Sequence, residues 1–445
     1  MPLSDYEVHD ILGEYAALGP TPAPEAAWPA LPELRRGRRR PVRRPPTYVS
    51  LVERDGLALW QWGFAKPHSI AHGRRAHAAG GPVALKGKEI FSDIIQPLGV
   101  NQISQLLLDF DVKRNPDFFR KDGWKLRQWH GNSQVLRDAN PPGAKAPKNI
   151  LLIVHGTASC CDHILSEIKL AEGGGKFLSD AARHYSAVLA FEHPTISMSP
   201  VLNALDLSAA LEPYGNCNVD IVCHSRGGLV ASWWMHVVDH RDRTKRCVYI
   251  GSPLQGTNLA NPAKLRSSLH LLANYGRILG HVGTAAGFLA LPMMILKVAA
   301  SVVDFTAKTP LLDAALAMIP GLGAQSAIDN NQELLRLNAR KSPKQGPPTQ
   351  FHIRANFVST DEKWKFWRYF TNNPKLRLIE AAVDTFVFPD ENDLVVDTAF
   401  MLDKVGGLDF KFPSEGGVVH HTNYFEQKQT IEKLREWLQI PDPAL

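Results

Sequence analysis

Residues 219–231, which read VDIVCHSRGGLVA, constrain the fold of this chain more than any other stretch. The segment begins with β-branched apolar residues, breaks at a polar and glycine-rich stretch, and continues with apolar residues three and four positions apart. It therefore predicts a buried strand, a tight turn and a buried helix. At the apex of the turn, Ser225 is expected in a strained backbone conformation with its hydroxyl raised above the sheet, while Gly227 and Gly228 let the helix pack close to the strand.

This turn resembles the nucleophile elbow of the α/β-hydrolase superfamily, in the lipase and esterase branch where a His precedes the Ser and a Gly pair follows it. Lecithin:cholesterol acyltransferase-like and bacterial lipase-like proteins belong to that branch. One position differs, because Cys223 replaces the first Gly of the pattern; Cys is small and apolar, as the position requires. The resemblance implies Ser225 as nucleophile. The alternative is a chance Ser in an ordinary turn between a strand and a helix.

A second turn that is similar to the lipase pattern lies earlier in the chain. Residues 150–154 form a continuous apolar run, typical of a strand buried on both faces, which ends in His155-Gly156-Thr157. In lipase-like hydrolases an HG turn at this place supplies one amide of the oxyanion hole. The resemblance therefore assigns that hole to the backbone N–H groups of Thr157 and of Arg226, which follows the nucleophile. The alternative is an ordinary turn with no such role.

The acid of a Ser-His-Asp triad is expected near residue 393. A strand is predicted at 384–388, and the sequence NDLVV follows at 392–396. Lipase-like hydrolases carry a similar N-D-x-V-V turn that delivers the acid, and Asp393 matches it. Asp390 and Asp397 are alternatives, and a solvated acidic turn without catalytic role is another.

The base is expected in the segment HHTNYF at 420–425. A similar H-[TS]-N-Y-F ending occurs in related hydrolases, which favours His421 as the base over its neighbour His420. Asn423 is predicted to cap the following helix, with Glu426 three residues on in the capping-box position. The order Ser225, Asp393, His421 is that of α/β-hydrolases.

The rest of the chain predicts an α/β fold with a mostly parallel central sheet flanked by helices and a helical cap insertion. Further strands are expected at 187–191, 247–250 and 350–357, with a helix at 201–211. The runs 57–62 and 103–112 are expected to be the first, antiparallel strands of the same sheet. We expect four regions: a flexible Pro- and Arg-rich arm at 1–46, the N-terminal part of the hydrolase domain with an insertion at 47–148, the catalytic core at 149–257 and 345–445, and an apolar helical cap at 258–344.

The predicted cap holds the most apolar stretch of the chain. Residues 278–296 contain no Asp, Glu, Lys or Arg, but Gly and Pro residues interrupt them. A membrane span needs about 20 apolar residues, and a span here would separate strands that must pair. We therefore expect a helical cap over the active site, touching a membrane or micelle surface transiently. A buried helical hairpin without mobility is the alternative.

Composition limits the partners of this protein. Seven arginines at 35–44 account for the basic character, since without them the net charge of +6 becomes −1. A nucleic-acid partner is therefore not expected. Five cysteines, an odd number without zinc-site spacing, and an acidic N-terminus unlike a signal peptide predict reduced thiols and a cytoplasmic location. Three histidines are interpreted as loop residues rather than metal ligands, and no metal or cofactor is predicted: His68, His72 and His77.

The predicted function is that of a serine hydrolase that cleaves carboxylic esters, with a small-molecule ester or lipid as substrate. The acyl group is expected to be apolar and to bind beneath the cap. An acyltransferase is an alternative within the same chemistry, because water and an acceptor alcohol compete for one acyl-enzyme. A non-catalytic hydrolase-fold module that binds a lipid or a protein is an alternative of another class.

Overall fold

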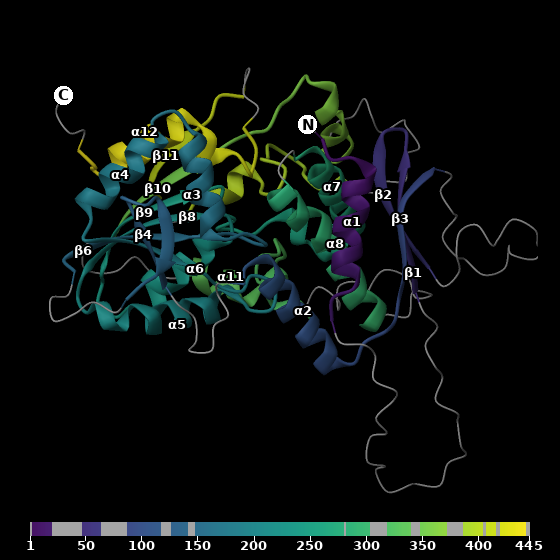
Figure 1. The fold of residues 1–445 in the computed structure, drawn as a ribbon, viewed down its shortest axis with the longest axis horizontal. Helices are drawn as coiled ribbons and strands as arrows, with labels where there is room; N and C mark the ends of the chain where they lie inside the picture. Colours follow the sequence, from purple (N-terminus) through teal and green to yellow (C-terminus); the bar gives the residue numbers. More distant parts are fainter. Residues whose placement is uncertain are drawn as a thin grey trace, which may run out of the picture. The chain divides into compact units, whose positions relative to one another are not determined.

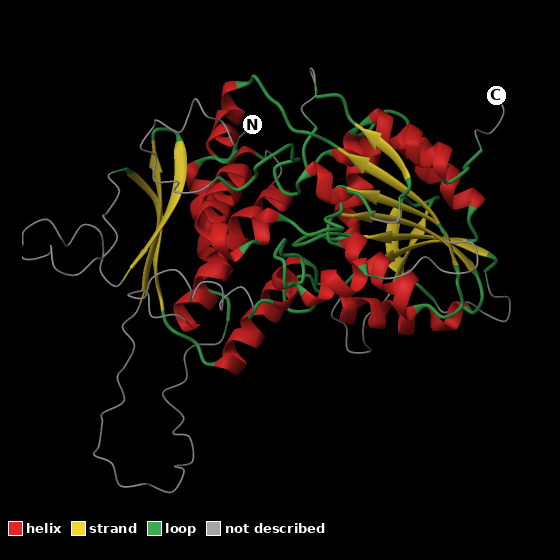
Figure 2. Cartoon of the chain, turned by 180° about the vertical axis from the view of Figure 1, so that it is seen from behind, coloured by secondary structure: helices red, strands yellow, loops and turns green. Residues whose placement is uncertain are grey.

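A computed structural model describes residues 2–19, 47–63, 87–116, 126–140, 147–279, 282–302, 318–339, 348–371, 386–403, 406–414 and 419–441. The chain divides into two compact units. The first comprises residues 1–110 and 272–318, and the second comprises residues 111–271 and 319–445. Figures 1 and 2 show both units. The helices α2 (Val100–Arg114) and α7 (Leu265–Ile278) straddle the positions where the division falls.

The second unit is built on an eight-stranded sheet with the strand order β11-β10-β9-β8-β6-β7-β4-β5. The six strands from β11 to β7 pair in parallel, and β4 and β5 are added antiparallel at one edge. In chain order the strands are β4 (Leu126–His130), β5 (Val135–Asp138), β6 (Asn149–Val154), β7 (Ala187–Phe191), β8 (Asn218–His224), β9 (Thr244–Ile250), β10 (Thr349–Arg354) and β11 (Leu408–Lys411).

Helices cover both faces of this sheet (Figure 1). Alternate residues of each central strand point to opposite faces, so Leu151 and Ile153 belong to one apolar cluster and Ile150 and Leu152 to the other. Burial on both faces explains the continuous apolar runs of these strands. The first cluster includes α3 (Cys161–Leu170), α4 (Gly174–His184) and α12 (Lys428–Trp437), and the second includes α5 (Pro200–Leu211) and α6 (Gly227–Trp233).

The predicted α/β-hydrolase fold is confirmed in this unit, since a mostly parallel sheet lies between two helical layers (Figure 2). Strands form at 150–154, 187–191, 219–224 and 247–250, as the sequence predicts. The predicted strand at 384–388 lies partly outside the described residues, and Phe388 makes only an isolated bridge with Thr371. Shorter helical segments complete the unit: η3 (Glu212–Tyr214), η4 (Trp234–Val238), η5 (Asn258–Ala260), η6 (Pro262–Lys264), α10 (Pro320–Gly323), α11 (Gln332–Asn338), η7 (Glu362–Tyr369), η8 (Thr398–Met401) and η9 (Tyr424–Glu426).

The first unit contains a three-stranded antiparallel sheet with the order β2-β1-β3. Its hairpin turns at Asp55 and Gly56, both at positive φ (52° and 79°), as a tight two-residue turn between twisted strands requires. The unit has the helices and strands α1 (Asp5–Ala16), β1 (Thr47–Arg54), β2 (Leu57–Gly63), β3 (Lys88–Ile95) and α8 (Val282–Val302), with the N-terminal part of α2 and the C-terminal part of α7.

The prediction that residues 1–46 lack regular structure is wrong for α1. Ser4 caps this helix: its Oγ accepts a hydrogen bond from the Glu7 N–H (3.3 Å), and the Glu7 carboxylate accepts one from the Ser4 N–H (2.8 Å). Such a capping box stabilises a short helix at its N-terminus. The sequence S-x-x-E carries this signal, and the acidic first turn reinforces it. Residues 20–46, with the seven arginines, lie outside the described residues.

The prediction for residues 47–148 is corrected in two respects. The run 57–62 is a strand, but it belongs to the separate sheet of the first unit, and the antiparallel strands of the main sheet are β4 and β5. The run 103–112 is part of α2. Its buried apolar residues lie three and four positions apart, which is the spacing of a helix: Ile103, Leu106, Leu107 and Phe110.

The apolar stretch of the predicted cap is helical, as expected, and forms most of α8. This helix packs against α1 within the first unit, where Leu289, Met293 and Met294 are fully buried. Lys297 Nζ of α8 donates to the carbonyls of Tyr15, Ala16 and Leu18 at the C-terminal end of α1. Among the described helices, none combines the length and the apolar character that crossing a bilayer requires. That this segment covers the active site stays a prediction.

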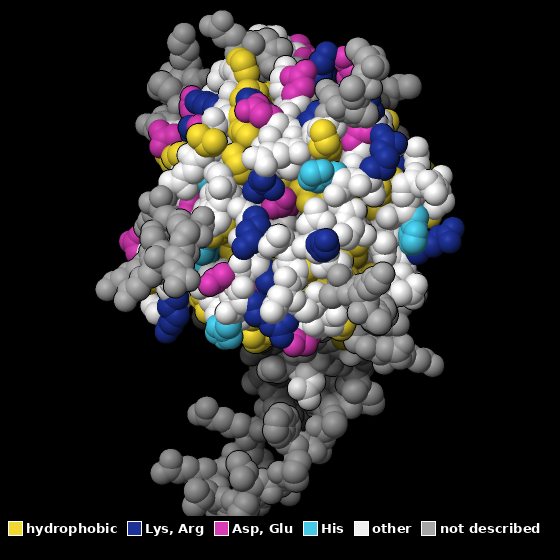
Figure 3. Space-filling model, turned by 90° about the vertical axis from the view of Figure 1, so that its left-hand side faces the viewer, with side chains coloured by type: hydrophobic (Ala, Val, Ile, Leu, Met, Phe, Trp, Pro, Cys, Tyr) yellow, Lys and Arg dark blue, Asp and Glu magenta, His cyan; other side chains and the backbone are white. Residues whose placement is uncertain are grey.

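Lysine and arginine side chains do not gather into one patch on the face drawn in Figure 3. Lysine and arginine side chains are interspersed there with acidic ones, and hydrophobic side chains lie scattered between them. All five cysteines are free thiols, four of them buried, as predicted.

Candidate active site

The turn between β8 and α6 has the geometry expected of an elbow. Ser225 has a φ of 52°, in the left-handed region that non-glycine residues rarely adopt, and its N–H donates to the Ile250 carbonyl (2.9 Å). A Cβ atom at Gly227 would lie 2.5 Å from the Val154 carbonyl oxygen and 2.6 Å from that of His155. Only glycine therefore lets α6 begin so close to β6.

Cys223 occupies the position of the missing glycine without strain. Its side chain is fully buried, and its Sγ donates to the Val248 carbonyl of the neighbouring strand (3.4 Å). The thiol therefore fits between β8 and β9 as a small apolar group that also has a weak hydrogen bond.

The structure brings Ser225, His421 and Asp393 together. His421 Nε2 lies 2.8 Å from Ser225 Oγ, and His421 Nδ1 lies 2.8 Å from Asp393 Oδ2. Ser225 follows β8, Asp393 lies in a turn beyond β10, and His421 precedes η9, so three distant segments meet at one end of the sheet. The three side chains are buried. Two hydrogen bonds in series can carry a proton from the hydroxyl to the imidazole while the carboxylate fixes the tautomer of the ring.

The carboxylate of Asp393 is held from several directions. Its Oδ1 accepts the backbone N–H groups of Val395 (3.0 Å) and Val396 (2.8 Å). Its Oδ2 accepts the hydroxyl of Tyr424 (3.0 Å) and faces His421. Because both oxygens have fixed donors, the carboxylate can present only one edge to the imidazole.

The His155-Gly156-Thr157 turn runs directly against the nucleophile. A Cβ atom at Gly156 would lie 2.7 Å from Ser225 Cβ. Within the described part of the chain, no hydrogen bond involves the backbone N–H of Thr157 or of Arg226. Both amides can therefore donate to a negative oxygen that develops on a substrate bound at Ser225.

A family model described as a domain of unknown function (DUF7379) matches residues 119–439. The chain belongs to the DUF7379 family. Ser225, Asp393 and His421 all lie within the matched range. Among proteins of curated function, none matches this sequence.

Solved structures to which this DUF7379 member is similar include three lipases or esterases. The mature lipase BlEst2 of Bacillus licheniformis has 16% identity and a TM-score of 0.35, covering 67% of this chain and 94% of that chain. EstA from Clostridium botulinum has 14% identity and a TM-score of 0.38, covering 69% and 90%. Phospholipase PlaB from Legionella pneumophila has 11% identity and a TM-score of 0.39, covering 66% and 63%.

The two alternative acids lie away from the imidazole. The carboxylate of Asp397 accepts from Asn258 Nδ2 (3.1 and 3.0 Å) and Asn258 N (3.4 Å), and burial raises its pKa. Asp390 is exposed on the turn. Asp393 is therefore the one of the three that meets His421.

The alternative base, His420, points elsewhere. Its ring packs against Trp364 (5.0 Å between centroids) and Phe357 (6.1 Å), and its Nδ1 lies 3.2 Å from Thr422 Oγ1. Burial lowers its pKa to about 3, so this ring is neutral. The Asn423 cap predicted for the last helix is wrong, because Asn423 Oδ1 accepts the N–H of His420 (2.8 Å) instead.

Two residues with a positioning role were missed by the sequence analysis. His224 Nε2 lies 2.9 Å from the carbonyl of His421, so this nitrogen must donate, and burial lowers the pKa of His224 to about 3. Tyr424 donates to Asp393. Both residues lie inside the motifs that point to the triad, but their partners are far away in the sequence.

The three histidines predicted to lie in a loop, His68, His72 and His77, are outside the described residues. Among the residues that the structure does describe, no group of three or more His, Cys, Asp or Glu side chains could hold a metal ion.

Proposed function

We propose that this protein is a serine hydrolase that cleaves carboxylic esters through an acyl-enzyme. One observation carries the proposal: the unbroken chain of 2.8 Å contacts from Ser225 Oγ through His421 to Asp393, with the serine at positive φ on a strand-to-helix turn. A buried serine of a merely structural turn needs neither an imidazole nor a carboxylate aligned behind it.

The reaction follows from these contacts. His421 Nε2 takes the proton of Ser225 as Oγ attacks the ester carbonyl, and the N–H groups of Thr157 and Arg226 stabilise the oxyanion. When the tetrahedral intermediate collapses, the protonated imidazole gives its proton to the departing alcohol, leaving an acyl group on Oγ. Water then attacks this acyl group with the same base, the acid leaves, and the serine is restored.

The substrate proposed for this site is an ester with an apolar acyl chain, lipid-like, that reaches the enzyme from a membrane or micelle surface. Support comes from the sequence of the segment 278–296, which contains no Asp, Glu, Lys or Arg. The fold adds no support for surface contact, because Leu289, Met293 and Met294 of this segment are buried within the first unit. Hydrolysis of p-nitrophenyl esters from acetate to palmitate tests it, with and without micelles. Each methylene buried on binding contributes roughly 0.8 kcal/mol, so kcat/KM should rise with chain length. A profile without chain-length dependence would reject the apolar acyl site.

A covalent fluorophosphonate probe tests the enzymatic class. The probe should label the wild-type protein, mass spectrometry should map the label to Ser225, and Ser225→Ala should remain unlabelled. An unlabelled wild-type protein would favour the non-catalytic binding module. Adding an acceptor alcohol to the ester assay separates hydrolase from acyltransferase, because an acyltransferase would release a new ester in place of the free acid.

A further inference from the structure

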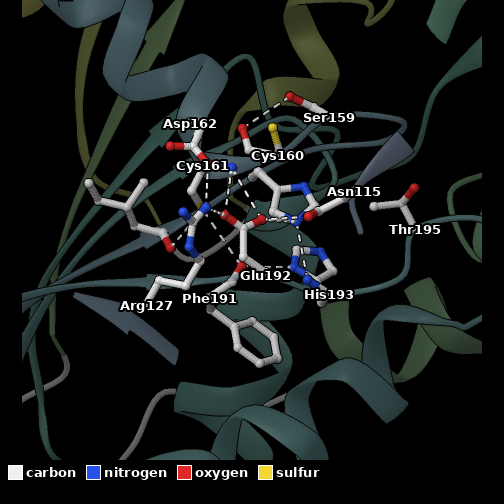
Figure 4. Close-up of polar contacts among 12 residues, drawn as sticks. Asn115, Arg127, Ser159, Cys160, Cys161, Asp162, Phe191, Glu192, His193 and Thr195 are labelled. Carbon is white, nitrogen blue, oxygen red and sulfur yellow. Dashed lines mark hydrogen bonds and ion pairs between the residues drawn. The ribbon is translucent and has the colours of Figure 1, made fainter. Parts of the chain in front are cut away.

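A fully buried carboxylate lies close to the turn His155-Gly156-Thr157, called the oxyanion turn below. Glu192, whose polar contacts Figure 4 draws, follows β7 directly, and none of its side chain is exposed. Its Oε2 accepts from Asn115 Nδ2 (2.5 Å), and its Oε1 accepts the backbone N–H of Cys161 (3.1 Å), the first residue of α3. A buried charge needs an opposite charge or strong donors to be tolerated, so the remaining neighbours of Glu192 decide its state.

The cation nearest to Glu192 is largely occupied by other groups. Arg127 Nη1 lies 3.6 Å from Glu192 Oε1, but the same nitrogen pairs with Asp162, and Nη2 donates to the Leu136 carbonyl (3.1 Å). Burial therefore dominates and, against the hydrogen bonds from Asn115 and Cys161, raises the pKa of Glu192 to about 7. Burial, and after it the nearby Glu192 carboxylate, raise the pKa values of the Cys160 and Cys161 thiols, so both stay protonated.

His155 is the neighbour that connects Glu192 to the active site. Its Nε2 lies 3.4 Å from Glu192 Oε2 and accepts the N–H of His193 (3.2 Å), so Nε2 carries a lone pair. Its Nδ1 donates to the Gly156 carbonyl (2.9 Å), and burial lowers the pKa of His155 to about 3. A protonated Glu192 can donate its O–H to Nε2 and share the one lone pair there with the His193 N–H, whereas the lone pairs of an ionised Glu192 would face that of Nε2.

The two ends of one segment therefore meet at Glu192. His155 begins the segment 155–161, Cys161 ends it, and Thr157 lies between them. Two further bonds hold its middle, because Arg114 donates to the Ala158 carbonyl (3.2 and 3.0 Å) and the Ala158 N–H donates to Thr195 Oγ1 (3.0 Å).

We propose that Glu192 is a positioning residue, which bridges His155 and Cys161 and so holds the Thr157 N–H in the direction of the oxyanion. The inference rests on the proposed function of the Ser225 site. Glu192 itself touches neither the substrate nor the triad; it acts through the shape of the segment 155–161. A misplacement of an oxyanion donor by about 1 Å is enough to cost a large part of the rate.

The test compares three variants in the full chain. Glu192→Gln keeps a donor for His155 and an acceptor for Cys161 and loses only the acceptor for Asn115, so its kcat should stay within about threefold of wild type. Glu192→Leu removes both, and its kcat should fall roughly tenfold to a hundredfold with little change in KM. Asp239→Asn is the matched control, since its carboxylate is as buried (2% exposed) but pairs with Arg243 before β9. Its kcat should not change.

Two further measurements distinguish positioning from general loss of structure. The affinity for a trifluoromethyl ketone, which forms an oxyanion on Ser225, should fall in Glu192→Leu by the same factor as kcat. The ratio of wild-type kcat to that of Glu192→Gln should fall as the pH rises through about 7. The carboxyl group of Glu192 ionises there only in wild type, and titrations that both proteins share cancel in the ratio. This ratio remains measurable if Glu192→Leu does not fold.

The outcomes separate the two proposals. A wild-type protein that neither hydrolyses esters nor reacts with fluorophosphonate would reject the serine hydrolase. An active wild type with an equally active Glu192→Leu would reject the role of Glu192 alone. That role would also be rejected by a flat ratio across pH 7, or by an Asp239→Asn variant that loses as much kcat as Glu192→Leu.

Discussion

His421 is held at three points. Its two ring nitrogens meet Ser225 and Asp393, and its backbone carbonyl accepts a hydrogen bond from His224. The tautomer with a proton on Nδ1 depends on Asp393, because only a carboxylate accepts there without offering a donor. A change at this one carboxylate should therefore disturb the reaction without disturbing the packing.

Asp393→Asn should lower kcat by roughly 10³- to 10⁴-fold, since its amide can donate to Nδ1 and favour the wrong tautomer. Asp397→Asn is the control, because Asp397 binds Asn258 instead, and it should retain kcat within a few-fold. Steady-state hydrolysis of a p-nitrophenyl ester, with folding checked by circular dichroism, measures both. The opposite ranking would assign the acid to Asp397.

The same reasoning separates the two histidines. His421→Ala should reduce kcat by several orders of magnitude because it removes the base. His420→Ala removes a neutral ring packed against Trp364, so it should lower the unfolding free energy but leave the kcat of the folded fraction nearly unchanged. Equal kcat losses in the two variants, after correction for unfolded protein, would show that the contact between His421 and Ser225 does not identify the base.

Among the elements, α6 depends most on a single glycine. Gly227→Ala would place a Cβ within 2.5 Å of the Val154 carbonyl and 2.6 Å of the His155 carbonyl, so α6 and the oxyanion turn must move apart. We expect a loss of at least about 2 kcal/mol of stability and most of the activity. Gly175→Ala in α4 is the control, because no atom lies within 4 Å of its new Cβ and alanine favours helices by about 1 kcal/mol. Equal melting temperatures of Gly227→Ala and Gly175→Ala would contradict this packing.

Elements with a local signal could be predicted from the sequence. The strands β6 and β7 are almost continuous apolar runs, β8 is rich in β-branched apolar residues, and the turns after β6 and β8 have motifs of their own. The helices α1 and α2 were missed, although the capping box at Ser4 and the spacing of apolar residues in 103–112 could have indicated them. The separate sheet of the first unit could not be predicted, because strand pairing and unit membership depend on contacts between distant residues.

The residues of the site also fall into those that the sequence could predict and those that it could not. Ser225, Asp393 and His421 each lie in a short motif, so their meeting could be predicted from chain order. Glu192 has no motif, because its meaning comes from Asn115 and Cys161, which lie 77 and 31 residues away. A buried glutamate is recognisable as unusual only once its surroundings are known.

At the scale of the whole molecule, buried neutral histidines set the dependence of stability on pH. Burial lowers the pKa of five of them far below the usual value near 6.5, and all belong to the second unit: His155, His193, His224, His270 and His420. Below pH 6.5 the unfolded chain binds protons that the folded unit cannot, so their contribution to stability is present above pH 6.5 and lost as the pH falls. Each such histidine contributes about 1.4 kcal/mol per pH unit in that range.

Glu192 and Glu167, whose pKa values burial raises, act in the opposite direction, but two carboxyl groups offset only part of the effect of five histidines. The pKa of Glu192 is raised from 4.5 to about 7, so its contribution is lost as the pH rises between these values. Urea unfolding of the second unit should therefore show a midpoint that falls steeply from pH 6.5 to 5, and His420→Phe should reduce this slope. A midpoint independent of pH in that range would contradict the burial of these rings in neutral form.

The most direct measurement is the kcat of wild type and of Ser225→Ala for p-nitrophenyl butyrate, with equal melting temperatures as evidence that both proteins are folded. An activated serine nucleophile predicts ester hydrolysis by wild type and a fall of at least about 10³-fold in the variant. If Ser225→Ala hydrolyses the ester at a rate near that of wild type, Ser225 is not the nucleophile and the proposed serine hydrolase is wrong.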